Sequence, residues 1–369
     1  MATGCAIVVG PATCLSEISI DLNLESGFQK GFFLGLPFWG LGVVSVFSGW
    51  IAERLGYCRL LVLSALIQVV GMLTIADADT KIQAYVGSLV TGLGRGMPAA
   101  PMTALVCSLF KENRTSVTNI LHGFFYVGMM SASAVVWLLM VLGLEWRTVF
   151  QIFSVTVALF GAGASIVRFP SIATKKSANY TGLRELFRNP VFIWIAAAIF
   201  FSGITEIGPT TWLPYFVKLA SETSQEFSIL SLFLLGLTMA MGRFVCASVA
   251  SKIGMKNVFT ICGLGSAISI SMAALPVGTY FTVFWLMVLG LMITVSFPTI
   301  VAYASDHFPT ANTSMFALLN AAAVAGGIVG PSIIGITADV FGLRQAMGMV
   351  ALAPLLLLFS LRRTFYRYE

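Results

Sequence analysis

Apolar residues occur in long runs along almost the whole chain, and short polar or Gly/Pro-containing segments separate these runs. A helix needs about 20 mostly apolar residues to cross the ~30 Å hydrocarbon core of a bilayer. Runs near or above this length cover residues 1–17, 29–52, 59–77, 82–109, 116–142, 147–168, 191–217, 227–251, 257–276, 279–305, 312–337 and 344–361. The pattern therefore predicts an all-α membrane protein with twelve transmembrane helices.

Composition supports this class and excludes others. Apolar residues make up 58% of the chain and charged residues 10%, with a mean hydropathy of +0.92, whereas soluble domains carry about 25% charged residues. The six cysteines lack the close pairing of a metal site or a disulfide framework, so we expect them to pack within helices. The net charge of +6 comes mainly from short loops, where membrane topology explains it without a nucleic-acid partner.

The loop charges also predict an orientation. Most basic residues follow the second, fourth, sixth and eighth apolar runs or lie in the carboxyl-terminal tail. Because cytoplasmic loops are enriched in Lys and Arg, we predict that these loops and the C-terminus are cytoplasmic. The expected location is a plasma membrane or a bacterial inner membrane, where the protein is surrounded by lipid as a monomer.

An internal repeat relates the two halves of the chain. One constant offset of 198 residues places Gly10 on Gly208 and Gly56 on Gly254. The predicted organisation is an N-terminal six-helix bundle (1–168), a cytoplasmic linker (169–189) and a C-terminal six-helix bundle (190–369). By this register the first helix lacks its opening turns, so we expect it to be truncated. Paired halves of this kind are typical of transporters that bind their solute between the halves at mid-depth.

The loop after the second apolar run carries a recognisable motif. Residues 49–59 read GWIAERLGYCR, and a weaker copy occupies 247–256. The motif resembles the signature of the major facilitator superfamily, G-x-L-A-D-R-x-G followed by basic residues. The resemblance implies a two-bundle fold and transport by alternating access. It also implies that this loop forms a charged latch that closes the cytoplasmic side, with these gating residues: Gly49, Glu53, Arg54, Gly56 and Arg59.

Two further stretches resemble one branch of that superfamily. Residues 119–125 (NILHGFF) and 206–212 (EIGPTTW) are similar to the fucose and glucose permeases. This resemblance implies symport of a sugar with H⁺ or Na⁺ and no bound cofactor. Acids found in the first and fourth spans of some members are absent here, where the fourth span carries Arg95 instead.

Glu206 is the candidate coupling residue. It is the one acid in the apolar run 191–217, and an ionisable group at membrane depth is costly unless it faces a bundle interior or a water-filled cavity. Pro209 lacks a backbone N–H and disfavours a straight helix through Gly208, so we expect carbonyl groups near Glu206 to be free. Binding of a proton or of sodium would neutralise the carboxylate and allow the two halves to close over it.

Candidate solute-binding residues lie in both halves. They are Thr211, Trp212 and Tyr215 beside Glu206, Arg95 in the fourth run, and the repeat-related pair His122 and Asn320. Each has a structural alternative. The two aromatic residues could belong to the interfacial belt, Arg95 could be satisfied by backbone carbonyls, and His122 and Asn320 could make ordinary interhelical hydrogen bonds.

A further cation, Arg243, lies in the eighth run. We favour a structural role for Arg243 over a binding role, with a side chain that reaches back to the cytoplasmic surface.

The function expected from these features is alternating-access transport, with cation-coupled symport of a small polar organic solute such as a sugar. Exchange or export of an organic anion or amphiphile is the first alternative, supported by Arg95 and Arg243. A non-transporting membrane sensor is the second. We do not expect an enzyme, because no Ser/His/Asp arrangement, metal cluster or phosphate-binding loop stands out and the chain has only two histidines.

Overall fold

A computed structural model describes residues 2–110, 114–169, 186, 188–220, 222–293, 296–308 and 312–365. The regular secondary structure of these residues is helical, and no strand occurs among them. Their elements are η1 (Ala2–Cys5), α1 (Ala6–Thr13), α2 (Leu15–Asp21), α3 (Gly27–Ala76), α4 (Lys81–Gly96), α5 (Ala99–Leu109), α6 (Arg114–Val141), α7 (Trp146–Ile166), α9 (Pro190–Ala220), α10 (Gln225–Ile253), α11 (Met255–Ala273), α12 (Thr279–Ile293), α13 (Ser296–His307), α14 (Asn312–Phe341), α15 (Leu343–Met349) and α16 (Leu352–Phe365).

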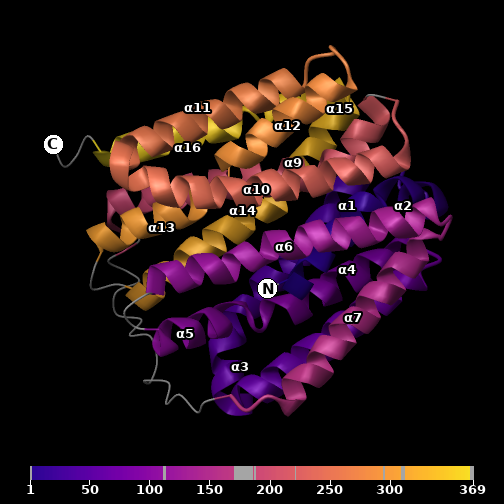
Figure 1. Ribbon diagram of the computed structural model, residues 1–369, viewed down its shortest axis with the longest axis horizontal. Helices are drawn as coiled ribbons and strands as arrows, with labels where there is room; N and C mark the ends of the chain where they lie inside the picture. The colour runs from indigo at the N-terminus through magenta and orange to yellow at the C-terminus, as the bar shows by residue number, and fades with distance from the viewer. Residues whose placement is uncertain are drawn as a thin grey trace.

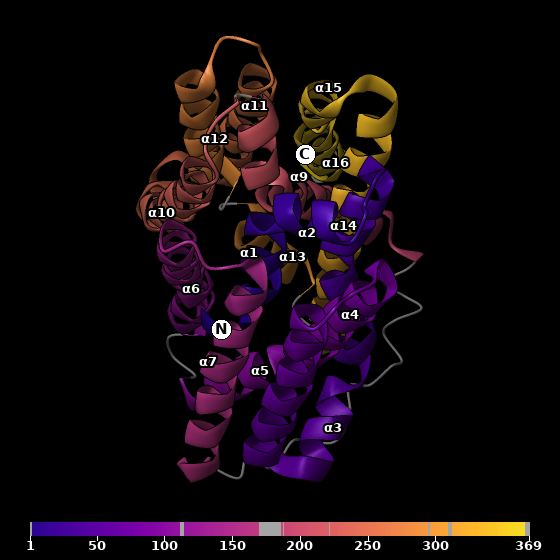
Figure 2. The ribbon, with the colours of Figure 1, turned by 90° about the vertical axis from the view of Figure 1, so that its right-hand side faces the viewer.

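The helices form two groups that follow chain order. In Figures 1 and 2, α3, α4, α5 and α7 lie in the lower group, and α10, α11, α12, α15 and α16 lie in the upper group. Helices α1, α9 and α14 lie between them. The groups meet where α2 ends and α3 begins, at the right of Figure 1, and diverge towards the left and bottom of that view.

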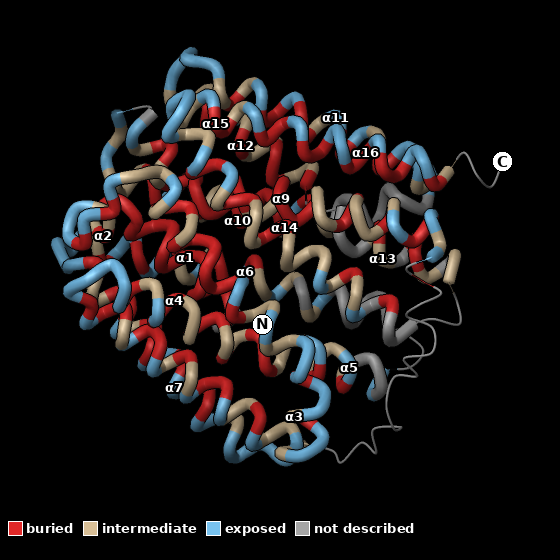
Figure 3. The backbone as a smooth tube through the Cα atoms, turned by 180° about the vertical axis from the view of Figure 1, so that it is seen from behind, coloured by how far each residue is buried: buried red, intermediate tan, exposed pale blue. Residues whose placement is uncertain are grey.

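The length and hydropathy of the helices fit a multi-pass integral membrane protein. Seven described segments are long and apolar enough to cross a bilayer: 27–76, 123–141, 146–166, 190–219, 225–243, 317–341 and 343–365. Large apolar side chains point outward from the peripheral helices, as Leu159 and Phe160 of α7 do at 68% and 61% exposure. Figure 3 shows buried positions concentrated in the central helices. The number of twelve crossings stays a prediction.

The 50-residue helix α3 contains a sharp change of direction. At 1.5 Å per residue it would measure about 75 Å if straight, more than twice the bilayer core. Gly56 interrupts it with φ 73° and ψ 162°. The two parts on either side of Gly56 match the second and third predicted spans.

The same backbone geometry recurs at two other glycines. Gly254, before α11, has φ 80° and ψ 151°, and Gly342, before α15, has φ 87° and ψ 156°. This region of φ/ψ space is accessible essentially to glycine alone. Gly56 and Gly254 are related by the 198-residue offset, so the repeat is visible in backbone conformation as well as in sequence.

Substitution of Gly56 by alanine should therefore destabilise the protein. We expect Gly56→Ala to lower the free energy of unfolding by about 1–3 kcal/mol. The cause would be backbone strain and not a steric clash, because no atom lies within 4 Å of a Cβ placed at Gly56. Gly49→Ala is the matched control, since Gly49 is helical and equally open; it should be neutral or stabilising by up to ~1 kcal/mol. Thermal unfolding in detergent compares the two, and equal losses would contradict a backbone cause.

Trp146 and Arg147 join three segments of the first half of the chain. Trp146 Nε1 donates to Asp21 Oδ2 at 2.7 Å, and Arg147 Nη2 donates to the Ala78 carbonyl at 3.1 Å. The Arg147 guanidinium lies 4.4 Å from the centre of the Trp146 ring. These contacts fix the start of α7 against the end of α2 and the loop before α4, which gives this Trp-Arg dipeptide a structural role.

Candidate functional site

Glu206 lies at the middle of α9, and its carboxylate contacts a helix from the first half of the chain. Tyr126 of α6 donates its hydroxyl proton to Glu206 Oε1 at 2.8 Å. The same Tyr126 oxygen accepts a hydrogen bond from Arg243 Nη2 of α10 at 2.9 Å. The guanidinium of Arg243 also lies 4.8 Å from the centre of the Tyr126 ring. A carboxylate, a phenol and a guanidinium thus form one hydrogen-bonded chain that joins the two halves of the protein.

The three residues of this hydrogen-bonded chain differ in how far they are buried. Tyr126 is 2% exposed, whereas Glu206 and Arg243 are partly buried. Tyr126 belongs to the first half, and both charged residues belong to the second. The phenol of the first half therefore bridges a carboxylate and a guanidinium of the second half. Movement of one half against the other must act directly on these hydrogen bonds.

Arg243 was expected to reach the cytoplasmic surface, and that prediction is wrong. Its head group points to Tyr126 instead, because the phenol offers both an oxygen acceptor and a ring face for a planar cation. Arg243 is thus the cation connected to Glu206. The structure places Arg95, the other cation considered, on α4 against η1, where any side chain at Gly4 would collide with its guanidinium.

Pro209 does not interrupt the helix in which Glu206 lies. Helix α9 runs without interruption from Pro190 to Ala220. The Thr210 hydroxyl donates to the Glu206 carbonyl at 2.6 Å, and the Thr211 hydroxyl donates to the Ile207 carbonyl at 2.8 Å. Two carbonyls close to Glu206 therefore accept hydrogen bonds from side chains of their own helix. The carbonyl that Pro209 deprives of its usual backbone N–H donor is that of Thr205, four residues earlier. Thr211 is itself buried at 1% exposure.

The aromatic candidates lie further along α9, towards α2. Trp212 is 1% exposed, and its Nε1 donates to the Pro331 carbonyl of α14 at 3.0 Å. It packs edge-on against Tyr215 with ring centres 5.8 Å apart. Tyr215 is partly buried, with Lys30 Nζ 5.9 Å from its ring centre. In this conformation Trp212 is a core residue rather than an exposed stacking surface or a lipid-belt residue.

The remaining candidate solute-binding residues are Asn320 and His122. Asn320 lies on α14 and is partly buried. His122 lies on α6, but its side chain is outside the described residues. It precedes Tyr126 by four residues, and residues at this spacing share one face of a helix. That relation is the signal in the sequence that could have identified Tyr126.

The predicted gating residues lie around the change of direction in α3. Gly49 is helical, Gly56 has the conformation described above, and the Arg54 guanidinium stacks 4.1 Å from the Trp50 ring centre. Glu53 and Arg59 are exposed. Within the described ranges, none of the ion pairs involves Glu53, Arg54 or Arg59. The latch remains a prediction for a conformation with this end closed.

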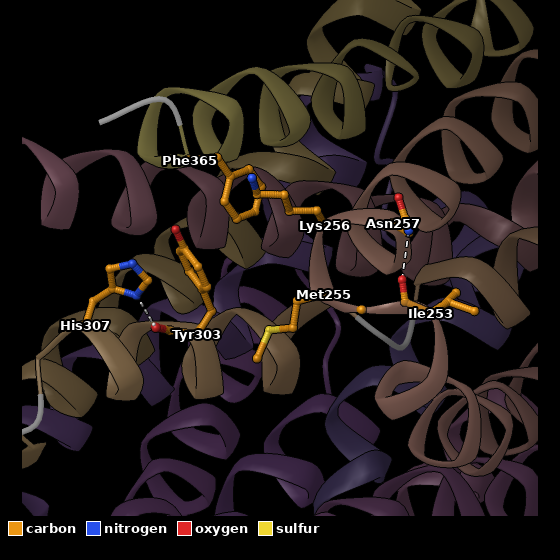
Figure 4. Close-up of a pocket in the computed structure, with 8 residues that line it drawn as sticks. Ile253, Met255, Lys256, Asn257, Tyr303, His307 and Phe365 are labelled. Carbon is orange, nitrogen blue, oxygen red and sulfur yellow. Dashed lines mark hydrogen bonds between the residues drawn. The ribbon is translucent and has the colours of Figure 1, made fainter. Parts of the chain in front are cut away.

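A cavity of about 530 Å³ lies in the second half, away from Glu206. The junction of α10 and α11, the end of α13 and the end of α16 line this open pocket. Figure 4 shows Lys256 over the Phe365 ring and His307 Nδ1 beside the Tyr303 carbonyl, at 5.4 Å and 2.9 Å respectively. None of its lining residues belongs to the hydrogen-bonded chain of Glu206, Tyr126 and Arg243.

No group of three or more His, Cys, Asp or Glu side chains suited to a metal occurs in the described part of the chain.

Comparison with known proteins identifies relatives over nearly the full length. The family described as Major Facilitator Superfamily matches residues 3–310 and, in a second match, 220–367. The chain is also similar to the cis,cis-muconate transport protein of Acinetobacter baylyi. The two sequences are 23% identical over 348 residues, which cover 88% of this chain and 82% of that protein.

Proposed function

Because the chain belongs to the Major Facilitator Superfamily, and is therefore a transporter rather than an enzyme, we propose that it carries a small organic anion together with protons. The observation that carries this proposal is the chain from Glu206 through Tyr126 to Arg243. Glu206 is assigned the proton, Arg243 the negative group of the solute, and Tyr126 the connection between them. The fucose and glucose permease branch expected from the sequence finds no support in the comparisons.

An anion suits the cation at this position. A guanidinium presents a planar fork of donors that binds a carboxylate through two parallel hydrogen bonds. Arg95 supplies a second guanidinium in the first half, suited to a solute with a second carboxylate. The similarity to a protein described as a muconate transporter supports the same class of solute, small carboxylates.

A proton is favoured over sodium by the groups around Glu206. Sodium is bound by several oxygen atoms, whereas Glu206 receives a hydrogen bond from Tyr126, and the Arg243 guanidinium lies at the far side of that phenol. The positive charge of Arg243 opposes binding of either cation, but a proton needs only one carboxylate oxygen, whereas sodium also needs several further oxygen ligands. A proton removes the charge of Glu206 at the same time as the solute carboxylate neutralises Arg243. Both charges are then compensated when the halves move.

A sugar is the second candidate, and its support is the aromatic pair of Trp212 and Tyr215, which could stack on an apolar sugar face. Since Trp212 is buried in this conformation, a sugar would reach it only after rearrangement. Anion exchange without protons and a sensor that does not transport complete the alternatives. The cytoplasmic C-terminus, the monomeric state and the latch around Glu53 belong to the same proposal.

Uptake by proteoliposomes tests the solute and the ion together. The panel contains cis,cis-muconate, a monocarboxylate such as benzoate and a neutral sugar, each measured with an imposed proton gradient, an imposed sodium gradient or neither. We expect accumulation of a carboxylate with the proton gradient alone. Accumulation of the sugar, or a requirement for sodium, would contradict the proposal, and exchange without accumulation would favour the antiport alternative.

A further inference from the structure

Helix α3 receives part of its N-terminal cap from the opposite half of the molecule. The first backbone N–H groups of a helix have no partner within it. Ser26 accepts a hydrogen bond from the Gln29 N–H at 3.1 Å in the usual way. The two preceding groups, Gly27 N–H and Phe28 N–H, donate instead to the carboxylate of Asp339 at 2.5 Å and 2.9 Å. Asp339 lies in the last turns of α14, so this cap is complete only while the halves are together.

The same two helices approach each other along a row of glycines. Gly27, Gly31 and Gly35 recur every four residues on α3. A Cβ at Gly27 would collide with the Gly335 carbonyl, and one at Gly31 with the Pro331 carbonyl. At Gly35 it would lie 3.2 Å from the Ile328 carbonyl. Small residues at this spacing allow helix backbones to make direct contact in a membrane.

A second set of contacts joins the halves at the same end. Lys218 of α9 pairs with Glu17 of α2 at 3.2 Å. Gln225 of α10 donates to the Thr13 carbonyl at 2.7 Å and to Glu17 Oε2 at 3.2 Å. Because partly exposed ion pairs contribute little to stability, we regard these contacts as secondary to the helix cap and the glycine row.

We infer that Asp339 and the glycine row of α3 form the gate that closes this end of the transporter. A solute entering from this side requires α3 and α14 to separate, since their backbones are in contact. Separation leaves Gly27 N–H, Phe28 N–H and the Asp339 carboxylate to water. A carboxylate at a helix N-terminus is favourable, so Asp339 biases the transporter towards the conformation with this end closed. The gate rests on alternating access but not on the identity of the solute or the ion.

The test measures the separation of the halves directly. Spin labels are attached at Ile82 of α4 and Val340 of α14, which are 68% and 71% exposed, in a variant whose six native cysteines are replaced. The distance distribution is recorded in lipid without solute. Asp339→Ala should increase the population with the longer label distance roughly fivefold, the effect of losing a helix cap. Asp339→Asn should give an intermediate increase, because it retains one acceptor oxygen.

Two further variants complete the test. Gly31→Ala should increase the same population without touching the carboxylate, because its methyl group prevents backbone contact. Asp79→Ala should leave the distribution unchanged, because Asp79 pairs only weakly, at 3.9 Å, with Arg147 of its own half and its side chain is 88% exposed. If Asp339→Ala does not fold, Asp339→Asn and Gly31→Ala carry the test. Unchanged distances in all folded gate variants would overturn the inference, whereas altered distances in a protein that transports no carboxylate would overturn only the proposed function.

Discussion

Glu206→Gln will abolish accumulation of the solute against its gradient while leaving exchange across the membrane largely intact. Glutamine has the shape of a protonated glutamate and still offers an oxygen to the Tyr126 hydroxyl, so the solute site should keep its geometry. It binds no proton at any pH of interest, so a proton gradient can no longer drive uptake. We expect the ratio of internal to external solute to fall to about one, with counterflow within roughly twofold of the wild-type rate.

The measurement uses proteoliposomes loaded at one pH and diluted into another, followed by counterflow at equal pH. Glu25→Gln is the matched control, because Glu25 is an exposed carboxylate in the loop before α3 and should retain both activities. Full accumulation by Glu206→Gln driven by the proton gradient would reject the coupling role. Loss of both activities would point to a structural role for the carboxylate instead.

Arg243→Gln should weaken solute binding on the order of 100-fold, the effect of losing a charge-assisted hydrogen-bond partner in a partly buried site. Arg243→Lys keeps the positive charge but loses the planar fork and the stacking on Tyr126, so its loss should be intermediate. Tyr126→Phe keeps the ring and removes the hydroxyl that joins Glu206 to Arg243. It should impair coupling more than solute affinity.

Equilibrium binding of a carboxylate solute to the detergent-solubilised protein measures these effects without requiring transport. Arg362→Gln serves as the control, because Arg362 is exposed in the last turn of α16 and should bind the solute normally. Wild-type affinity in Arg243→Gln would remove this residue from the solute site. A comparable loss in Arg95→Gln would extend the site to the first half.

The sequence was sufficient for much of the architecture. Hydropathy alone predicted a multi-pass membrane protein, and the signature loop predicted the family. The repeat placed Gly56 and Gly254 in equivalent positions, and both have the backbone that only glycine adopts. These features are local or periodic, so they leave a regular trace along the chain.

The central site was only partly predictable. Glu206 could be selected because a lone acid in an apolar helix is costly, but its partners come from α6 and α10, and no periodic pattern links residues 126, 206 and 243. Tyr126 resembles any aromatic residue of a membrane helix until the fold places it between two charges. Pro209 lies within a continuous helix, and the threonine hydroxyls that follow it bond to carbonyls of the same helix.

The burial of Trp212 has a practical consequence for following this protein. Its indole donates to the carbonyl of Pro331, and that carbonyl lies against Gly31 in the contact between α3 and α14. Water admitted between these helices would change the polarity around the indole and shift its fluorescence emission. Trp212 is thus an intrinsic optical reporter beside the seam, and a variant in which the other six tryptophans are replaced would follow opening and closing in real time.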